Sequence, residues 1–336
     1  MPWSSRPWYP EDQNSVYSRI TGTGGYLPEK VLSNKDLEKM VDTTDDWIFD
    51  RTGIRNRHIA AEGQTTTDLA EIAARRALEM AGRDPQDIDL IVLATTTPDR
   101  IFPSCACLLQ QRLDIHGCTA FDVQAVCTGS VYALGVADKF IRSGTHRCAL
   151  VVGAETVSRI IDWTDRTTCV LFGDGAGAVI LEASDELGIL STHLHADGKY
   201  ESLLNVPFGV SQGYEHLLRG EAYMQMKGNE VFRMAVNTLG RIVDETLEAN
   251  GLTKSDVDWL VPHQANNRII AATAKKLDMQ MDHVVVTVED HGNTSAASVP
   301  LALDTAVRDG RIKRGETVLM EAFGGGFTWG SVLLKY

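Results

Sequence analysis

The chain repeats itself, and the repeat limits what it can fold into. Residues 78–92 (LEMAGRDPQDIDLIV) match residues 247–261 (LEANGLTKSDVDWLV) without a gap, so position 78 corresponds to position 247, a shift of 169. Further on, QRLDIHGCTAFDVQAVCTGS aligns with KKLDMQMDHVVVTVEDHGNTS with a small slip. Self-similarity on this scale indicates a duplicated unit. We therefore expect two α/β halves that pack about a pseudo-twofold axis, with their helices and sheets in layers.

Both halves alternate between apolar runs and amphipathic segments. Continuous apolar runs are typical of strands that are covered on both faces, and we expect such strands at 88–94, 118–126, 148–153, 178–181, 259–261, 284–288, 318–322 and 327–335. Helical spacing with capping residues predicts helices at 67–81, 104–113, 230–250, 266–276 and 295–309. Thr67 or Asp68 is the expected N-cap of the first of these helices.

The boundaries of the halves follow from composition. Residues 1–19 contain three prolines and no periodic apolar pattern, so we expect a flexible N-terminal extension. Residues 20–189 then form the first half, and residues 190–336 form the second.

Charge, hydropathy and cysteine spacing exclude several classes of protein. A net charge of −13 disfavours a nucleic-acid-binding role. There is no apolar run of the roughly 18–20 residues that a membrane span needs, and no basic start followed by an apolar core. The six cysteines form no CxxC pair, which argues against a zinc site. These features predict a cytoplasmic protein with reduced thiols and no metal.

Cys127 lies where a strand-like run, 121–126, turns into a helix-like run. The free N–H groups and the positive dipole end of a helix favour negative charge, which lowers a thiol pKa and produces the nucleophilic thiolate. A small buried residue at a tight junction explains the same position, because free cysteine is among the most buried residue types. The stretch alone does not decide between these interpretations.

Two polar turns follow strands in the second half. His263 stands just past the strand 259–261, and Asn293 lies in the turn HGNTS. The duplication places Cys127 and Asn293 at nearly equivalent strand ends, and ligand sites gather at the carboxyl ends of strands. Cysteine with a distant histidine and asparagine is a pattern for covalent catalysis, which fits a hydrolase as well as an acyl transferase. A core histidine and a helix-capping asparagine are the structural alternatives.

Several further segments have binding potential. Trp47 and Arg51 can stack on an adenine and pair with phosphate. The glycines of 324–327 allow close backbone approach and can stabilise an oxyanion, although a tight turn is the commoner meaning. The run 172–177 (FGDGAG) precedes a strand and does not open a helix, so it is not a dinucleotide-binding loop. A basic patch at 268–276 with Arg233 suggests an acidic partner, and a solvated helix face is the alternative.

Seven motifs together give a specific resemblance: DTTDDWIFDRTGIRNRHIA, FDVQAVCTG, FGDGAGAV, STHLHADG, DWLVPHQANNRII, HGNTSAAS and EAFGGGFTWG. In this order over residues 20–336, the chain resembles β-ketoacyl-acyl-carrier-protein synthase III, the initiating condensing enzyme of type II fatty acid synthesis. The resemblance implies an α/β thiolase-like fold with five αβαβα layers, built from two duplicated halves.

The resemblance also implies a reaction. An acyl-CoA primer, expected to be acetyl-CoA, would acylate Cys127, and malonyl-acyl-carrier protein would be decarboxylated and condensed onto the acyl group. His263 and Asn293 would hold the malonyl thioester carbonyl and stabilise the enolate. The N–H groups of Cys127 and Gly325 would form the oxyanion hole. Coenzyme A enters as a thioester substrate, and no separate cofactor or metal is implied.

Binding positions are implied as well. Trp47 and Arg166 would sandwich the adenine of coenzyme A, and Phe323 would position the catalytic groups. The phosphopantetheine channel would be lined by Arg51, Thr52, Gly228, Phe232 and Asn266. The acidic carrier protein would dock on Arg233, Arg268 and Lys275. Phe102 would reach the acyl pocket of the other subunit in a homodimer.

The chain departs from the family beside the nucleophile. Where the family usually has Cys-Ala-Gly-Phe, this chain has Cys127-Thr128-Gly129-Ser130. We hypothesise altered packing behind the acyl pocket at Ser130, with an effect on primer chain length. Two rival functions keep the fold: a condensing enzyme of polyketide or signal-molecule synthesis, and a non-catalytic acyl-binding scaffold.

Overall fold

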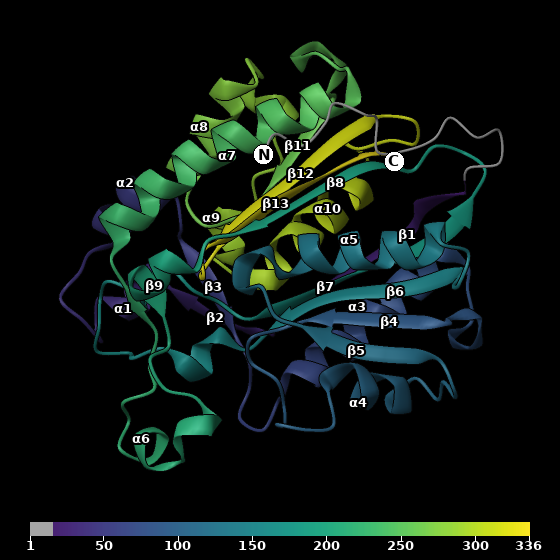
Figure 1. Cartoon of the computed structure of the whole chain (residues 1–336). Coiled ribbons are helices and arrows are strands. Elements are labelled where there is room, and N and C mark those ends of the chain that lie inside the picture. The colour runs from purple at the N-terminus through teal and green to yellow at the C-terminus, as the bar shows by residue number, and fades with distance from the viewer. Residues whose placement is uncertain (1–15) are drawn as a thin grey trace.

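Two mixed sheets, one from each half, form the framework of the computed structural model, which describes residues 16–336 (Figure 1). The N-terminal sheet has the order β1-β7-β6-β4-β5, with β4 parallel to both β5 and β6. The C-terminal sheet has the order β11-β12-β13-β8, with β11 parallel to β12. Their bounds are β1 (Tyr17–Tyr26), β4 (Leu90–Ala94), β5 (Thr119–Val123), β6 (Cys148–Glu155), β7 (Gly175–Ser184), β8 (Ile189–Ala196), β11 (Trp259–Pro262), β12 (Thr317–Gly324) and β13 (Thr328–Lys335).

Helices cover the outer faces of both sheets and fill the space between them (Figure 1). On the N-terminal sheet lie α3 (Thr66–Ala81) and α4 (Cys105–Arg112). Between the sheets lie α5 (Gly129–Arg142) and α10 (Ser298–Arg308), and α7 (Gly228–Asn250) and α8 (Asn267–Lys276) cover the C-terminal sheet. This arrangement confirms the five-layer αβαβα fold. Shorter elements are β2 (Lys30–Ser33), α1 (Asn34–Leu37), α2 (Asp45–Thr52), β3 (Asn56–Ile59), β9 (Leu204–Asn205), α6 (Glu215–Leu218), β10 (Gln225–Met226) and α9 (Val288–His291).

The predicted duplication is present in the structure. The pairs β4 and β11, α5 and α10, and β6 and β12 each begin the same 169 residues apart, at 90 and 259, 129 and 298, and 148 and 317. In this register Cys127 corresponds to Ala296, and Asn293 lies three residues before that equivalent position. The two polar side chains therefore reach the same site from related but unequal positions of the two halves.

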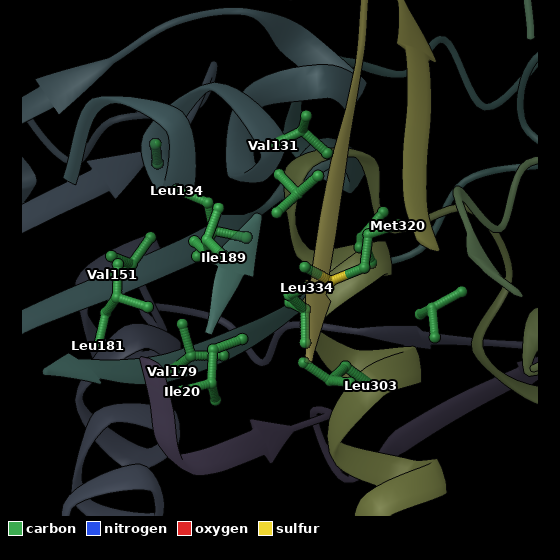
Figure 2. Packing of buried hydrophobic residues seen from close by; sticks show 14 of the residues in the cluster. Ile20, Val131, Leu134, Val151, Val179, Leu181, Ile189, Leu303, Met320 and Leu334 are labelled. Atoms are coloured by element: carbon green, nitrogen blue, oxygen red, sulfur yellow. The ribbon is translucent and has the colours of Figure 1, made fainter. Parts of the chain in front are cut away.

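Apolar side chains from both sheets and from the two central helices form one buried cluster (Figure 2). Val131 and Leu134 of α5 and Leu303 of α10 pack between Val151 of β6 and Met320 of β12. Burial of apolar surface at about 25 cal/mol per Å² is the main force that holds the layers together. The strands that carry the site residues are thus anchored in a dry interior.

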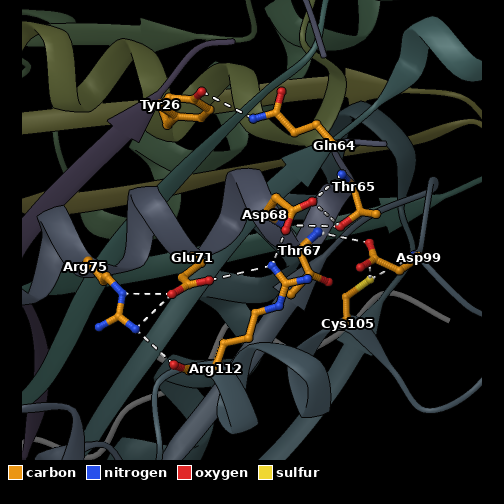
Figure 3. Close-up of polar contacts among 10 residues, drawn as sticks. All are labelled: Tyr26, Gln64, Thr65, Thr67, Asp68, Glu71, Arg75, Asp99, Cys105 and Arg112. Atoms are coloured by element: carbon orange, nitrogen blue, oxygen red, sulfur yellow. Dashed lines mark hydrogen bonds and ion pairs between the residues drawn. The ribbon is translucent and has the colours of Figure 1, made fainter. Parts of the chain in front are cut away.

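The N-terminus of α3 is fixed by polar contacts (Figure 3). Thr65 is its N-cap, and a capping box with Asp68 satisfies the first free N–H groups. The observed cap lies two or three residues before the expected one, Thr67 or Asp68. Arg112 of α4 pairs with the carboxylates of Asp68, at 2.5 Å, and of Glu71, at 3.6 Å. These contacts tie α3 to α4.

One predicted strand is wrong. Residues 284–288 form no strand: Val284 makes a single parallel bridge with Leu260 of β11, and α9 begins at Val288. The side chain of Gln264 takes the place of a strand partner here, because its amide nitrogen donates to the Val285 carbonyl (3.0 Å) and its amide oxygen accepts from the Thr287 N–H (2.8 Å). The side-chain amide of Gln264 thus takes up the backbone groups that a neighbouring strand would otherwise pair with, and the strand pairing ends here.

Other boundaries move by a few residues. β1 begins at Tyr17, so the last three residues of the expected extension are strand, and the first 15 residues of that extension lie outside the described part. The expected division at 189/190 falls one residue into β8. β5 ends at Val123 rather than at 126, and β7 already begins at Gly175, inside the glycine run. Across the described helices, none combines the length and apolar character needed to cross a membrane.

Candidate active site

Cys127 lies in a strained turn between β5 and α5. A short 3₁₀ turn, η2 (Val126–Thr128), joins the two elements, and Val126 has a φ of 48°. A positive φ at a β-branched residue is a strained outlier that persists only where the surroundings enforce it. The turn places Cys127 at the N-terminal end of α5, as the sequence predicted.

Cys127, His263 and Asn293 line one cavity of about 340 Å³. Their exposed fractions are 4%, 6% and 5%, so all three are buried at its inner end. The three residues come from η2, from the end of β11 and from the turn before α10. The structure therefore brings these three distant residues together, as the sequence predicted.

His263 is held by one hydrogen bond to its backbone and one to its ring. Its backbone N–H donates to the Glu321 carbonyl at 2.8 Å, and its ring Nδ1 lies 2.5 Å from the Ser298 hydroxyl. Burial lowers the pKa of His263 to about 3. The ring is therefore neutral at physiological pH, with one nitrogen able to donate and one able to accept a hydrogen bond.

The thiol of Cys127 is shifted in the direction opposite to the one that the helix end alone predicted. Burial raises the pKa of Cys127 to about 12, the nearby Glu155 carboxylate adds to the rise, and the Ser295 hydroxyl opposes it. Desolvation disfavours the charged form of a buried group. Cys127 is therefore a protonated thiol at rest, and a thiol in this state can act as a nucleophile only where a proton acceptor is present.

Asn293 is fixed by its own turn. Its backbone N–H donates to the Leu171 carbonyl at 2.8 Å, and its side-chain oxygen accepts the Ser295 N–H at 2.9 Å. Because the oxygen is engaged with the backbone, the amide NH₂ is the group that remains for the cavity. Asn293 thus satisfies a backbone N–H in the turn before α10 and leaves a donor for the cavity. The N-cap of α10 is Ala297, so the helix-capping alternative for Asn293 is wrong.

Aromatic and cationic side chains surround the mouth of the cavity. The guanidinium of Arg51 lies 4.5 Å from the ring centre of Trp47, and that of Arg166 lies 5.2 Å from it. Every residue that the resemblance assigned to the adenine or to the phosphopantetheine channel lines this cavity: Trp47, Arg51, Thr52, Arg166, Gly228, Phe232 and Asn266. Phe323, which was expected to position the catalytic groups, lines it too.

Other predicted positions lie elsewhere. Phe102 is 82% exposed on a surface loop, and Ser130 lines a separate cavity of about 10 Å³ behind the nucleophile. Gly325 does not line the main cavity; the neighbouring Gly324 lies closer to the nucleophile, since a Cβ on it would be 2.8 Å from the Cys127 nitrogen. Of the basic residues, Arg233, Arg268 and Lys275 are exposed, and Arg268 also lies at the cavity mouth.

The unusual residue beside the nucleophile has partners. The Thr128 hydroxyl donates to the Thr328 carbonyl at 3.1 Å, and the Thr328 hydroxyl donates to the Ala125 carbonyl at 2.9 Å. This pair ties η2 to the strand that follows the glycine loop. A polar residue at position 128 is therefore accommodated without an unsatisfied hydroxyl.

Three residues of the site were not predicted individually. Ser295 and Ser298 fall inside the HGNTSAAS motif, and Glu155 ends the apolar run of β6. A carboxylate that terminates a fully buried strand is a detectable signal, because charged residues are rarely buried without a partner. As for metals, the described residues contain no cluster of three or more His, Cys, Asp or Glu side chains that could hold an ion.

Comparison with known proteins gives matches along most of the chain. Residues 121–198 match the family model described as 3-oxoacyl-[acyl-carrier-protein] synthase III, and residues 247–336 match the model of its C-terminal part. A β-ketoacyl-[acyl-carrier-protein] synthase III of Thioalkalivibrio sulfidiphilus is 73% identical over 96% of this chain and 100% of its own length.

Solved structures match as well. The 3-oxoacyl-[acyl-carrier-protein] synthase III of Aquifex aeolicus is 48% identical, with a TM-score of 0.90 over 95% of this chain and 100% of that chain. A priming β-ketosynthase of the R1128 polyketide pathway is 40% identical, with a TM-score of 0.91 over 96% of this chain and 97% of that chain.

Proposed function

The chain belongs to the 3-oxoacyl-[acyl-carrier-protein] synthase III family, and from this premise we propose how its own residues divide the reaction. It is a condensing enzyme, an acyltransferase that initiates fatty acid synthesis from an acyl-CoA and malonyl-acyl-carrier protein. The observation that carries the assignment of residues is the convergence of Cys127, His263 and Asn293 at the inner end of one cavity.

In the first half-reaction, the sulfur of Cys127 attacks the thioester carbonyl of the acyl-CoA. The negative charge that develops on the carbonyl oxygen is stabilised by the backbone N–H groups of Cys127 and Gly325. Support for this pairing is the close approach of the glycine loop to η2, where a Cβ on Gly324, the neighbour of Gly325, would lie 2.8 Å from the Cys127 nitrogen. Coenzyme A leaves, and the acyl group stays on the sulfur.

In the second half-reaction, His263 and Asn293 donate hydrogen bonds to the thioester carbonyl of the malonyl group. Loss of carbon dioxide converts this carbonyl into an enolate oxygen, and neutral donors are suited to a charge that only then develops. The Gln264 N–H points at the Ser298 oxygen from 3.4 Å, so this oxygen acts as an acceptor towards Gln264. We therefore assign the Ser298 hydroxyl as the donor and Nδ1 of His263 as the acceptor of the hydrogen bond between them. Nε2 then carries the hydrogen that faces the cavity.

We assign the adenine of coenzyme A to the space between Trp47 and Arg166. A stacked base needs about 3.5 Å on either face, hence about 7 Å between the two groups, which now lie 5.2 Å apart. Arg166, which donates to the Asp42 carbonyl at 2.7 Å on the surface, therefore moves outward when the base enters. The pantetheine arm then follows the cavity past Phe232 towards Cys127.

Acetyl-CoA is the primer that we propose. The cavity beside Ser130 holds about 10 Å³, which is room for about one water molecule and not for an alkyl chain. A phenylalanine at position 130 does not fit this volume either, so the substitution reshapes a packed region rather than opening a long acyl channel.

The partners follow from the surface. We propose that the acidic carrier protein docks on Arg233, Arg268 and Lys275, none of which forms an ion pair with another described residue. We propose a homodimer as well, supported by the exposed apolar pair Ile101 and Phe102, 61% and 82% exposed. A cytoplasmic location is proposed on the six free cysteines.

The test is incubation with a panel of acyl-CoAs and malonyl-carrier protein, with product masses as the readout and Cys127→Ala as the control. We expect a 3-oxoacyl-carrier protein, fastest with acetyl-CoA, and no product from the variant. Free acid without a new carbon–carbon bond would instead indicate a hydrolase. Turnover only with a polyketide carrier protein would favour the polyketide alternative.

A further inference from the structure

A buried thiol that attacks a thioester must give up a proton, and His263 is poorly placed to take it. With the Ser298 hydroxyl proton on Nδ1, the cavity-facing Nε2 of His263 is a donor. The enolate chemistry of the proposed function needs that donor. The proton of Cys127 therefore requires another acceptor within the interior.

Glu155 is a buried carboxylate next to the nucleophile. It ends β6 with none of its surface exposed, and five hydrogen-bond donors converge on it. Oε1 accepts from the hydroxyls of Thr96 (2.6 Å) and Ser295 (3.0 Å). Oε2 accepts from the hydroxyls of Thr97 (2.7 Å) and Thr95 (3.2 Å) and from the Thr96 N–H (3.1 Å). Among the described ion pairs none includes Glu155, so hydrogen bonds alone hold this carboxylate.

Ser295 connects this carboxylate to the thiol. The turn η8 (Ser295–Ala297) packs against η2, which carries Cys127. The Ser295 hydroxyl donates to Oε1 of Glu155 at 3.0 Å, and its nearness to the thiol lowers the pKa of Cys127 against the rise that burial causes. The backbone of Ser295 is strained, with a φ of 49°, and its N–H is held by the side-chain oxygen of Asn293 at 2.9 Å. Strained non-glycine residues persist where the surroundings enforce them, often at functional sites. The strain here places one hydroxyl between two titratable groups.

The environment of the pair is otherwise uncharged in the described contacts. The loop after β4 presents the three threonine hydroxyls to Glu155, η8 (Ser295–Ala297) presents Ser295, and η2 presents Cys127. His263, which lines the same cavity as Cys127, is neutral. Burial raises the pKa of Glu155, which makes this carboxylate a better proton acceptor than an exposed one.

We propose that Ser295 relays the proton of Cys127 to Glu155, and that Glu155 holds this proton for as long as the cysteine is acylated. As the sulfur attacks the acyl-CoA carbonyl, the S–H proton passes to the Ser295 oxygen and the Ser295 hydroxyl proton passes to Oε1. The negative charge passes from the carboxylate to the attacking sulfur, then to the carbonyl oxygen, and leaves on the thiolate of coenzyme A, which takes a proton from solvent. When the condensation releases Cys127 as a thiolate, the two transfers reverse, and that charge returns to Glu155 as the proton goes back to sulfur.

This proposal rests on the proposed function for its substrate, but formation of the thiolate can be measured without that substrate. Glu155→Gln removes the acceptor, and Ser295→Ala removes the relay while the carboxylate and its threonine donors stay. Thr96→Val is the matched control, because it removes one donor to the same oxygen but leaves the relay intact. If Glu155→Gln does not fold, Ser295→Ala decides alone.

The readouts are alkylation of Cys127 by iodoacetamide and single-turnover acetylation by acetyl-CoA, both followed by the mass of the Cys127 peptide from pH 6 to 10. We expect both rates at pH 7 to fall about 100-fold in Glu155→Gln and Ser295→Ala. The remaining rate should rise about tenfold per pH unit as hydroxide replaces the carboxylate. Thr96→Val should keep the wild-type pH profile, with rates changed less than about threefold.

Malonyl-carrier protein decarboxylation, measured on enzyme that was first acetylated at pH 10, separates a relay from a structural role. We expect it to change less than about twofold in both variants, since the decarboxylation uses His263 and Asn293. The relay would be overturned if the pH profiles of Glu155→Gln and Ser295→Ala coincide with that of the wild type, or if decarboxylation falls as much as acylation does. Alkylation that depends on Glu155 in a chain that acetyl-CoA does not acetylate would support the relay and refute the proposed reaction.

Discussion

A buried carboxyl in β12 should make the stability of the fold fall as the pH rises. Glu321 has no exposed surface, and neither of its carboxylate oxygens has a hydrogen-bond partner of good geometry. Burial raises the pKa of Glu321 to about 8, and the Thr273 hydroxyl on α8 only partly opposes this rise. At neutral pH the side chain is therefore an uncharged acid.

The size of the effect follows from the two pKa values. The ordinary pKa of a glutamate is 4.5, so between pH 4.5 and about 8 the unfolded chain has lost this proton while the folded chain keeps it. Where the folded state binds more protons, stability decreases with pH. At about 1.4 kcal/mol for each pH unit, the loss reaches at most about 5 kcal/mol above pH 8.

Glu321→Gln removes the titration and keeps the shape. We expect its urea midpoint, at fixed protein concentration, to change much less between pH 6 and pH 9 than that of the wild type. Glu79→Gln, on the exposed face of α3, is the matched control and should follow the wild type. Parallel pH profiles for wild type and Glu321→Gln would refute the reasoning. Because the Glu321 carbonyl holds the His263 N–H, wild-type activity should fall with stability at high pH.

Three further outcomes are expected. Ser298→Ala should slow malonyl decarboxylation about 10–100-fold with little change in Cys127 acetylation. The variant loses a buried hydrogen bond of about 1–3 kcal/mol, so nothing then keeps the His263 proton on Nε2. Equal losses in both steps would contradict this assignment. Trp47→Ala should raise the KM for acetyl-CoA about tenfold and leave kcat unchanged, as expected for lost ring stacking; an unchanged KM would place the adenine elsewhere. Reversal of charge at Arg233 and Lys275 should raise the KM for malonyl-carrier protein at low salt without affecting acetyl-CoA, which steady-state kinetics at two salt concentrations can check.

Much of the architecture was readable from the chain because it depends on local patterns. The 169-residue repeat, the buried runs predicted at 88–94 and 148–153 and the helices of both halves follow from apolar periodicity. The structure confirms these elements, with the first strand beginning two residues later, at Leu90. The strand expected at 284–288 failed because a side chain distant from that run, Gln264, satisfies its backbone. Periodicity does not show which polar group competes for a backbone partner.

The candidate site divides in the same way. Residue type and position at strand ends were enough to single out Cys127, His263 and Asn293, since the duplication and the motifs bring these strand ends together. The protonation of Cys127 was predicted in the wrong direction, because burial depends on the packing of both halves and not on the helix start next to it. Glu155 and Ser295 lie 140 residues apart and are joined only by the fold. The sequence by itself thus determined which groups are present and which layers carry them, and the tertiary structure alone decided which proton each group can hold.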